Sequence, residues 1–240
     1  MHLKHVKIHP EKFPVRDCYP FNISVFQVYQ DILFKSPVTF FAGENGTGKS
    51  TLLEAVTRLC NIHIWCDTEG SQYKYNPYQR KFHQYISVEW VDKPVSGSFF
   101  GSSIFQYFSQ ILDEWASMDP GQLKYFGGKS LLTQSHGQSI MAYFKSRYKK
   151  RGLYLLDEPE TALSPKTQIE LLEILIETGR QNQAQFIIST HSPILLACPG
   201  AIIYSFDDGK IKQIEYEETM HYQFYKSFLE NRDGYLQWLK

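Results

Sequence analysis

The order of apolar and polar residues predicts buried strands that alternate with amphipathic helices along the chain. Residues 38–42, 153–156 and 186–189 are short and almost entirely apolar, which is typical of strands covered on both faces of a parallel sheet. Apolar side chains at helical spacing predict helices around these strands, at residues 50–59, 103–118, 135–148 and 167–178 and in the tail from about 217. This alternation indicates an α/β fold.

Weaker strand signals lie near the two ends of the chain. These segments are residues 3–8, 32–34, 202–206 and 211–214. The first alternates apolar and basic residues, as a half-buried strand does. The last two flank the Asp208-Gly209 pair, which is a signal for a hairpin turn.

The interval from about 61 to 130 has the least regular pattern. It is rich in aromatic residues and is interrupted by Gly, Pro and Ser, with only short strand-like pieces such as 85–91 before the helix at 103–118. The length of 240 residues fits one large domain. We therefore expect a single domain over residues 1–240, with an accessory or helical insertion at about 61–130.

Composition excludes some classes of function. Lys+Arg and Asp+Glu both number 25, and this balance does not support a nucleic-acid binder that works by bulk charge. The N-terminal segment MHLKHVKIHP lacks the apolar core of a signal peptide. No stretch approaches the ~20 apolar residues that a membrane-spanning helix needs. We expect a cytoplasmic protein without direct insertion into a membrane.

The four cysteines are scattered, which favours reduced thiols. Cys60, His63 and Cys66 are close enough in sequence for a metal site to be considered. Three ligands at this unusual spacing make a poor zinc site, so we favour packing roles for them.

Residues 43–50 match the phosphate-binding pattern GxxxxGK[ST] at every fixed position, between an apolar strand and a helix. Backbone N–H groups of such a loop and the N-terminus of the helix bind phosphates. Lys49 is expected to reach the β- and γ-phosphates of a nucleotide, and the Ser50 hydroxyl to hold Mg²⁺. The predicted nucleotide-binding residues here are Gly43, Glu44, Asn45, Gly46, Thr47, Gly48, Lys49, Ser50 and Thr51.

Two later apolar strands end in residues suited to phosphate chemistry. The first ends in Asp157 and Glu158, so Asp157 is a candidate Mg²⁺ ligand and Glu158 a candidate base for the attacking water. Capping of the next helix is the alternative for this pair. The second strand is followed by His191, a candidate contact to the γ-phosphate, although a lone histidine at a strand end is more often structural.

A third candidate segment precedes the acidic strand. Ser135, Gly137 and Gln138 lie where a helix is predicted to begin, and a helix N-terminus with a hydroxyl and free N–H groups can bind an anion. An ordinary N-cap serine is the alternative.

The motifs GENGTGKS, QSHGQ, LYLLDEPE, TALS and STHSP occur in an order that resembles the ABC-type ATPases. The similarity is greatest to small stand-alone bacterial predicted ATPases related to the DNA-repair and chromosome-structure branch. It implies an α/β P-loop fold with a mostly parallel central sheet flanked by helices and an N-terminal antiparallel portion. It also implies an ATP hydrolase with Mg²⁺, in which two subunits enclose two ATP molecules head to tail. Ser135 and Gly137 would then act on the ATP of the partner.

The chain departs from the family pattern at several positions. Gln134 and His136 stand where a transporter-type signature has Leu and Gly, and Ser164 stands where many relatives have Asp. Gln106 is our candidate for the glutamine that normally contacts metal and water. Tyr19 and Phe21 are candidates for the aromatic that stacks on adenine.

The sequence leaves the purpose of ATP hydrolysis open. One hypothesis is DNA repair or defence against foreign DNA, with nucleic acid, a nuclease or a toxin as partner. The alternatives are a switch that recruits a protein and a transporter subunit. Basic and aromatic residues alternate in 73–82, which suits an accessory layer better than single-stranded nucleic acid. The apolar stripe of Tyr235, Leu236, Trp238 and Leu239 suits docking on the body of the chain itself.

Overall fold

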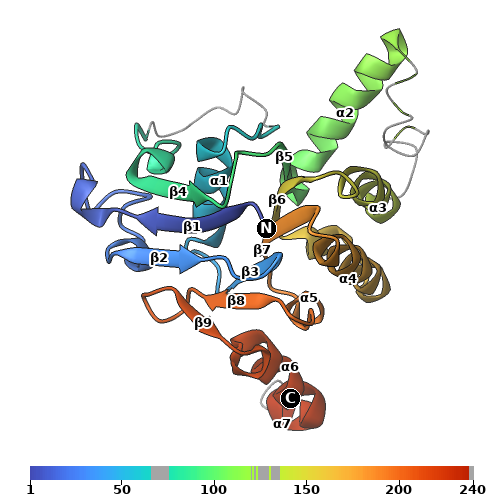
Figure 1. Cartoon of the computed structure of the whole chain (residues 1–240). Helices are drawn as coiled ribbons and strands as arrows, with labels where there is room; N and C mark the ends of the chain where they lie inside the picture. The colour runs from blue at the N-terminus through green and yellow to red at the C-terminus, as the bar shows by residue number, and fades with distance from the viewer. Residues whose placement is uncertain (66–75, 120, 122, 124–129, 131–135, 238–240) are drawn as a thin grey trace.

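The structure is a computed structural model that describes residues 1–65, 76–119, 121, 123, 130 and 136–237. Its described strands form two sheets (Figure 1). The central sheet has the order β5-β6-β7-β3-β8-β9, and only its last pair, β8 and β9, is antiparallel. These strands are β3 (Val38–Ala42), β5 (Gly97–Gly101), β6 (Gly152–Asp157), β7 (Ala184–Ser189), β8 (Ile202–Ser205) and β9 (Lys212–Ile214). The predicted mostly parallel α/β sheet is confirmed.

The second sheet is antiparallel, has the order β2-β1-β4 and lies beside the central sheet. Its strands are β1 (Leu3–Ile8), β2 (Gln30–Leu33) and β4 (Ile86–Trp90). The antiparallel portion expected at the N-terminus therefore also takes a strand from the interval 61–130.

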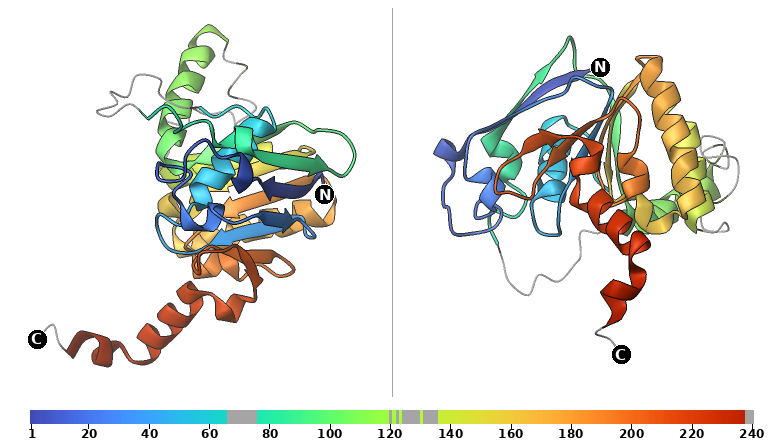
Figure 2. Two further views of the ribbon diagram at one scale, coloured as in Figure 1. Left: turned by 90° about the vertical axis from the view of Figure 1, so that its left-hand side faces the viewer. Right: turned by 90° about the horizontal axis from the view of Figure 1, so that it is seen from below.

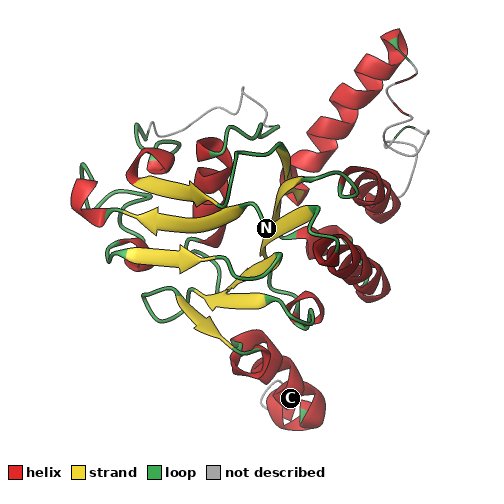
Figure 3. Cartoon of the chain, in the orientation of Figure 1, coloured by secondary structure: helices red, strands yellow, loops and turns green. Residues whose placement is uncertain are grey.

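Helices cover the central sheet on both faces, with α1 on one side and α3 and α4 on the other (Figure 3). The helices are α1 (Lys49–Leu59), α2 (Ser102–Met118), α3 (His136–Arg147), α4 (Pro165–Arg180), α5 (Pro193–Leu196), α6 (Met220–Glu230) and α7 (Arg232–Leu236). Figure 2 shows α6 and α7 extending away from the two sheets. No helix in the described ranges is both long enough and apolar enough to cross a bilayer.

The central strands are apolar throughout because the sheet has a hydrophobic core on each of its two faces. Side chains alternate along a strand, so neighbouring residues enter different cores. Phe40 and Leu156 pack in the core formed with α2, α3, α4 and α5. Phe41 and Leu155 pack in the core shared with α1 and the antiparallel sheet. Both faces are therefore buried, and the strands have no polar face.

Strand β5 does not follow from the apolar pattern, and the prediction left its residues without an element. Its sequence is Gly-Ser-Phe-Phe-Gly, with a glycine at each end. A Cβ on Gly97 would lie 2.0 Å from the carbonyl oxygen of Leu153 on β6. Close approach to the neighbouring strand therefore requires glycine here, and glycine weakens the sequence signal for a strand.

Candidate nucleotide-binding site

The parallel register brings the carboxyl ends of three strands to one edge of the central sheet. Asp157 at the end of β6 pairs with Ser189 at the end of β7, and Ser189 pairs with Phe41 near the end of β3. In open α/β sheets, ligands bind outside this edge. The sequence-predicted phosphate loop, acidic pair and histidine each follow one of these strands.

The phosphate loop runs from β3 into α1 with glycines in conformations that other residues rarely adopt. Gly43 has φ 141° and Gly48 has φ 104°. A Cβ on Gly43 would lie 2.8 Å from the Asp207 carboxylate, and one on Gly48 would lie 2.8 Å from the Phe26 ring. Both the backbone and the neighbouring side chains therefore require glycine at these two positions.

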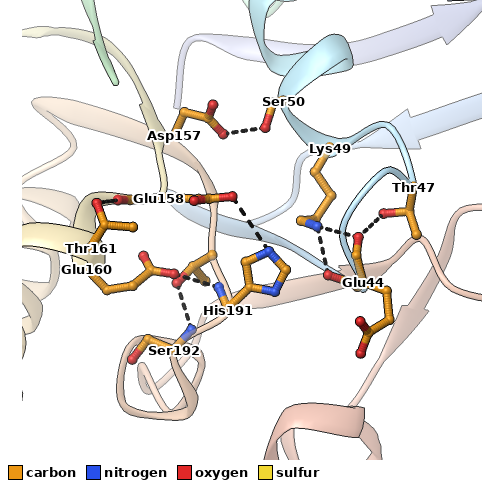
Figure 4. Close-up of polar contacts among 12 residues, drawn as sticks. Glu44, Thr47, Lys49, Ser50, Asp157, Glu158, Glu160, Thr161, His191 and Ser192 are labelled. Carbon is orange, nitrogen blue, oxygen red and sulfur yellow. Dashed lines mark hydrogen bonds and ion pairs between the residues drawn. The ribbon is translucent and has the colours of Figure 1, made fainter. Parts of the chain in front are cut away.

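Lys49 lies over the loop that precedes it (Figure 4). Its Nζ donates to the carbonyl oxygens of Gly43 at 2.7 Å and of Glu44 at 2.8 Å, and only 4% of the residue is exposed. Burial lowers the pKa of Lys49, and the surrounding carboxylates, with Glu158 the strongest, oppose that shift. The ammonium is thus held inside the curve of the phosphate loop, where an anion would lie.

Ser50 and Asp157 contact each other across the site, since the Ser50 Oγ donates to the Asp157 carboxylate at 2.8 Å. Burial raises the pKa of Asp157 to about 6, and the bond from Ser50 opposes the rise. A hydroxyl and a carboxylate on rigid elements are oxygen donors of the kind Mg²⁺ takes, with phosphate oxygens and water completing its shell. The pair therefore fits a Mg²⁺ ion bound together with a nucleotide.

Glu158 points away from its neighbour Asp157 because the chain turns sharply between them. Its backbone is left-handed, with φ 46° and ψ 55°, an uncommon conformation for a residue with a side chain. Two hydrogen bonds hold the turn: the Glu158 N–H donates to the Ser189 carbonyl at 2.9 Å, and the Thr161 hydroxyl to the Glu158 carbonyl at 2.9 Å. Its carboxylate faces His191, with 3.6 Å between Oε1 and Nε2 (Figure 4).

His191 is fixed from two directions. Its backbone N–H donates to the Glu160 carboxylate at 2.6 Å. Its Nδ1 lies 2.9 Å from Nε2 of His221, a residue of α6. Burial lowers the pKa of His191, and the positive charge of Lys49 adds to the effect. The ring is therefore neutral near pH 7 and can serve as a hydrogen-bond donor.

The structure brings Lys49, Ser50, Asp157, Glu158 and His191 to one site, but the signature segment lies elsewhere. Gly137 and Gln138 lie at the start of α3, on the opposite face of the central sheet from α1. They line a groove of about 590 Å³ together with Lys145, Ala162, Ser164 and Glu170. Ser135 lies outside the described residues. Ser164, where relatives often have Asp, caps α4 by accepting from the Thr167 N–H at 3.3 Å.

Of the two adenine-stacking candidates, only Tyr19 is accessible. The residue is 42% exposed, and its hydroxyl lies 3.1 Å from that of Thr51 on α1. Phe21 is fully buried and packs against other aromatic rings, including Tyr78 at 5.6 Å between centroids. Phe21 is thus a core residue and not a surface for adenine, and Tyr78 of the segment 73–82 packs against the same core.

Other candidates from the sequence are settled in part. The side chain of Gln106, on α2, lies outside what the structure describes. Burial raises the pKa of Cys60 to about 12. Cys66, the third residue of the metal site that the sequence analysis considered, lies outside the described residues. In the tail, the Tyr235 ring packs on Phe224 and Phe228 of α6 at 5.8 and 5.7 Å between centroids, while Trp238 and Leu239 are outside the described range.

Two residues of the site escaped the sequence reasoning. Asp207, which precedes the predicted hairpin pair Asp208-Gly209, accepts from the backbone N–H of Glu44 at 2.8 Å and so supports the phosphate loop. His221 belongs to no motif, and its helix begins 29 residues after His191 in the sequence. Nothing in the local pattern relates either residue to a nucleotide, so only the tertiary structure reveals them.

Two family models match parts of the chain that contain the residues of this site. A family model described as "AAA domain" matches residues 21–61, which include the phosphate loop. A second, described as "AAA domain, putative AbiEii toxin, Type IV TA system", matches residues 139–197, which include the acidic pair and His191.

Curated relatives include two ATP-binding proteins. The petrobactin import ATP-binding protein FpuD of Bacillus anthracis is 27% identical over 184 residues, or 68% of this chain and 65% of its own length. The ferric enterobactin transport ATP-binding protein FepC of Escherichia coli is 28% identical over 157 residues, or 60% of this chain and 58% of its own length. The chain thus spans roughly 60% of the length of each of these relatives.

Solved structures share the fold at low sequence identity. CbiO1 of Clostridium perfringens, part of the ABC transporter complex cbiONQ, has a TM-score of 0.51 at 18% identity and covers 97% of this chain and 98% of its own. The SMC head domain of Thermotoga maritima has a TM-score of 0.50 at 16% identity and covers 90% and 99%.

Fold, motif order and matches together define the class. The fold is that of ABC-type P-loop ATPases, and the chain is similar in sequence to ATP-binding proteins of that class, which is a class of ATP hydrolases. Its fold is shared by SMC heads as well as by transporter ATP-binding subunits.

Proposed function

We propose that the protein binds ATP with Mg²⁺ at this site and hydrolyses it to ADP and phosphate. The observation that carries the proposal is the meeting of two pairs, Ser50 with Asp157 and Glu158 with His191, beside the buried ammonium of Lys49. Each pair joins different segments of the chain. Their convergence at one sheet edge is what an in-line phosphoryl transfer to water requires.

Each side chain has a distinct role in this proposal. Lys49 and the N–H groups of the phosphate loop bind the phosphates. The ammonium of Lys49 supplies a positive charge, and the N–H groups point their positive dipole ends at the phosphate oxygens. Glu158 orients the attacking water and takes its proton. His191 donates from Nε2 to the oxygens on which charge develops. Mg²⁺ held at Ser50 and Asp157 would neutralise phosphate charge as the bond breaks.

The proposal includes a head-to-tail dimer in which each subunit completes the other's site. Gly137 and Gln138 lie in the first turn of α3, where Gly137 is partly exposed and Gln138 is exposed, so a second subunit can reach them. The first turn of α3, with Gly137 and Gln138, would then close over the partner's ATP, together with Ser135, which precedes this helix in the sequence. Two identical chains that pair across a twofold axis form an isologous interface, in which the phosphate loop of each chain faces the α3 segment of the other and two equal sites result.

We further propose that the ATP cycle serves DNA repair or defence against foreign DNA. The description of the family model that covers residues 139–197, which names a toxin system, supports this direction, as does the fold shared with SMC heads. A protein-recruiting switch is the alternative. A transporter subunit is suggested by the import proteins among the relatives, and it would need a membrane-spanning partner.

Measuring ATP turnover with and without DNA distinguishes the DNA-linked role from the protein-recruiting switch. Double- and single-stranded DNA should each be added to the parent protein at low salt, because phosphate contacts weaken steeply as salt rises. A several-fold rise in kcat with DNA would support the DNA-linked role. Unchanged kcat and no DNA binding by anisotropy would favour the switch.

The Glu158→Gln variant tests the catalytic assignment. Gln keeps the size and a hydrogen-bonding oxygen but not the charge, so hydrolysis should slow by roughly 10² to 10⁴ while ATP binding survives. ATP then acts as a ligand that favours the closed dimer, and the dimer should accumulate. Light scattering after size exclusion, with and without Mg-ATP, measures it. A variant that turns over ATP normally, or stays monomeric at saturating ATP, contradicts the role.

A further inference from the structure

His221 contacts the site from an element that no motif predicts. It lies in the first turn of α6, whose N-cap Thr219 accepts from the Tyr222 N–H at 3.3 Å. The His221 and His191 rings have centroids 5.1 Å apart and an interplanar angle of 66°, with Nε2 of His221 2.9 Å from Nδ1 of His191. This geometry is that of a direct hydrogen bond between two imidazoles.

The outer nitrogens of the pair have no hydrogen-bond partner among the described residues. These atoms are Nε2 of His191 and Nδ1 of His221, and both are buried. The Glu158 carboxylate lies 3.6 Å from the first of them. Burial lowers the pKa of both histidines, so each ring is neutral near pH 7 and carries one N–H and one lone pair.

Only one proton lies between the two rings, and two arrangements are possible. If His191 donates from Nδ1, its Nε2 lone pair faces the Glu158 carboxylate, so two acceptors oppose each other. If His221 donates from Nε2, His191 carries its proton on Nε2 and offers an N–H to Glu158. In the second arrangement the unpartnered atom of His221 is a lone pair and not a buried N–H. An orphaned N–H is the rarer of the two in folded proteins.

We propose that His221 is a positioning residue that donates to Nδ1 of His191 and so holds His191 in its Nε2–H form. The donor of His191 is thereby aimed at Glu158 and at the terminal phosphate of ATP. This inference rests on the proposed role of His191 in hydrolysis. In metal sites and catalytic triads, the partner of one imidazole nitrogen sets the tautomer at the other in the same way.

Two substitutions of His221 distinguish the donor from mere packing. His221→Gln places an amide nitrogen near the position of the imidazole Nε2 and can still donate, whereas His221→Leu fills the space without a donor. The proposal predicts that His221→Leu lowers kcat by roughly tenfold or more with little change in ATP affinity, the pattern of a group that acts in the transition state. His221→Gln should restore most of the loss.

The tautomer itself is measured in nucleotide-free protein by long-range ¹H–¹⁵N NMR of ¹⁵N-labelled histidine. His191→Gln identifies the His191 signals among those of the 8 histidines. The parent and His221→Gln should show Nε2–H at His191, and His221→Leu should show a mixture or the Nδ1–H form. This spectrum does not depend on turnover, so it also reports on a parent that fails to hydrolyse ATP.

The outcomes separate cleanly. A parent protein with His191 in the Nδ1–H form overturns the inference, as does a folded His221→Leu variant with parental kcat. If His221→Leu does not fold, the parent tautomer and the kcat of His221→Gln decide. The expected tautomers in a parent without ATPase activity would support the contact and refute the proposed function of the site.

Discussion

Two adjacent acidic residues have different surroundings at the end of β6. Asp157 still lies on the strand, where its carboxylate accepts from Ser50. Glu158 is the first residue past it, and its left-handed backbone turns its side chain toward His191. Uncommon backbone conformations of this kind concentrate at functional sites, where surrounding hydrogen bonds hold them. One peptide unit thus directs one carboxylate toward Ser50 and the other toward His191.

The buried carboxylate of Asp157 should make the metal-free protein less stable at neutral pH. Its pKa is raised from 3.8 in the unfolded chain to about 6 in the fold, so the folded state binds more protons between these pH values. Stability therefore falls as pH rises through this window. At about pH 7.5 and without Mg²⁺, Asp157→Asn should raise the free energy of unfolding by about 1–3 kcal/mol, at 1.36 kcal/mol per pKa unit.

Urea denaturation at about pH 7.5 and pH 5 tests this expectation. The advantage of Asp157→Asn should shrink at the lower pH, where the parent carboxyl takes up its proton. Added Mg-ATP should stabilise the parent more than the variant, because the variant has lost a charged ligand. An equal free energy of unfolding for the two proteins at both pH values would show that burial of the ionised Asp157 carboxylate does not destabilise the metal-free protein.

At the scale of elements, the start of α3 and the loop before α4 form one surface. A Cβ on Gly137 would lie 3.0 Å from the carbonyl oxygen of Ala162, so the signature helix and the Pro159–Ala162 turn lie in close contact. Ser164 then begins α4 as its N-cap. A substitution at the start of α3 should therefore alter the proposed dimer surface. It should leave intact the phosphate loop, which connects β3 to α1.

Ser135→Arg is expected to separate ATP binding from turnover. A bulky cation at this position should block closure over the partner's ATP, leaving ATP affinity near that of the parent. Hydrolysis should fall by at least roughly 10²-fold, because stabilising groups from the partner are withheld. Lys49→Ala is the matched control, since it should lose several kcal/mol of phosphate contact and with it ATP binding. Parental turnover by Ser135→Arg would exclude an in-trans role.

At the scale of the whole molecule, a head-to-tail dimer has a consequence that a monomeric site does not. Each of its two sites combines the phosphate loop of one chain with the signature segment of the other. A mixed dimer of Lys49→Ala and Ser135→Arg therefore has one site with both defects and one with neither. Complementation between two inactive variants is possible only if the sites are shared.

Mixing the two variants should restore activity that neither has alone. With random pairing and independent sites, the mixture should reach about a quarter of parental turnover, because about half of the dimers hold one intact site of two. The measurement is ATP turnover of each variant and of the mixture at equal total concentration. No recovery in a mixture shown to form mixed dimers would argue that each chain builds its site alone.

The sequence by itself determined the class of fold and the local parts of the site. Strand β3 has the predicted limits, Val38–Ala42, and α1 and β7 differ from the predicted elements only by a residue or two at one end. Their patterns are clear because a strand buried on both faces must be apolar throughout, and because a phosphate loop needs its glycines and lysine at fixed spacing. Motif order along the chain then sufficed to indicate an ABC-type ATPase.

What only the tertiary structure decided were contacts between segments far apart in the chain. Strand β5, Asp207 and His221 all depend on a neighbour that lies distant in sequence: Leu153, Glu44 and His191 respectively. The role of Phe21 was also decided by distant neighbours. The sequence made its ring a candidate for stacking on adenine, but the structure shows that the ring is fully buried. Local periodicity reports how a residue meets solvent and its own element. It does not specify which distant residues the folded chain brings within hydrogen-bonding distance. Those contacts depend on how the two sheets and α6 pack together.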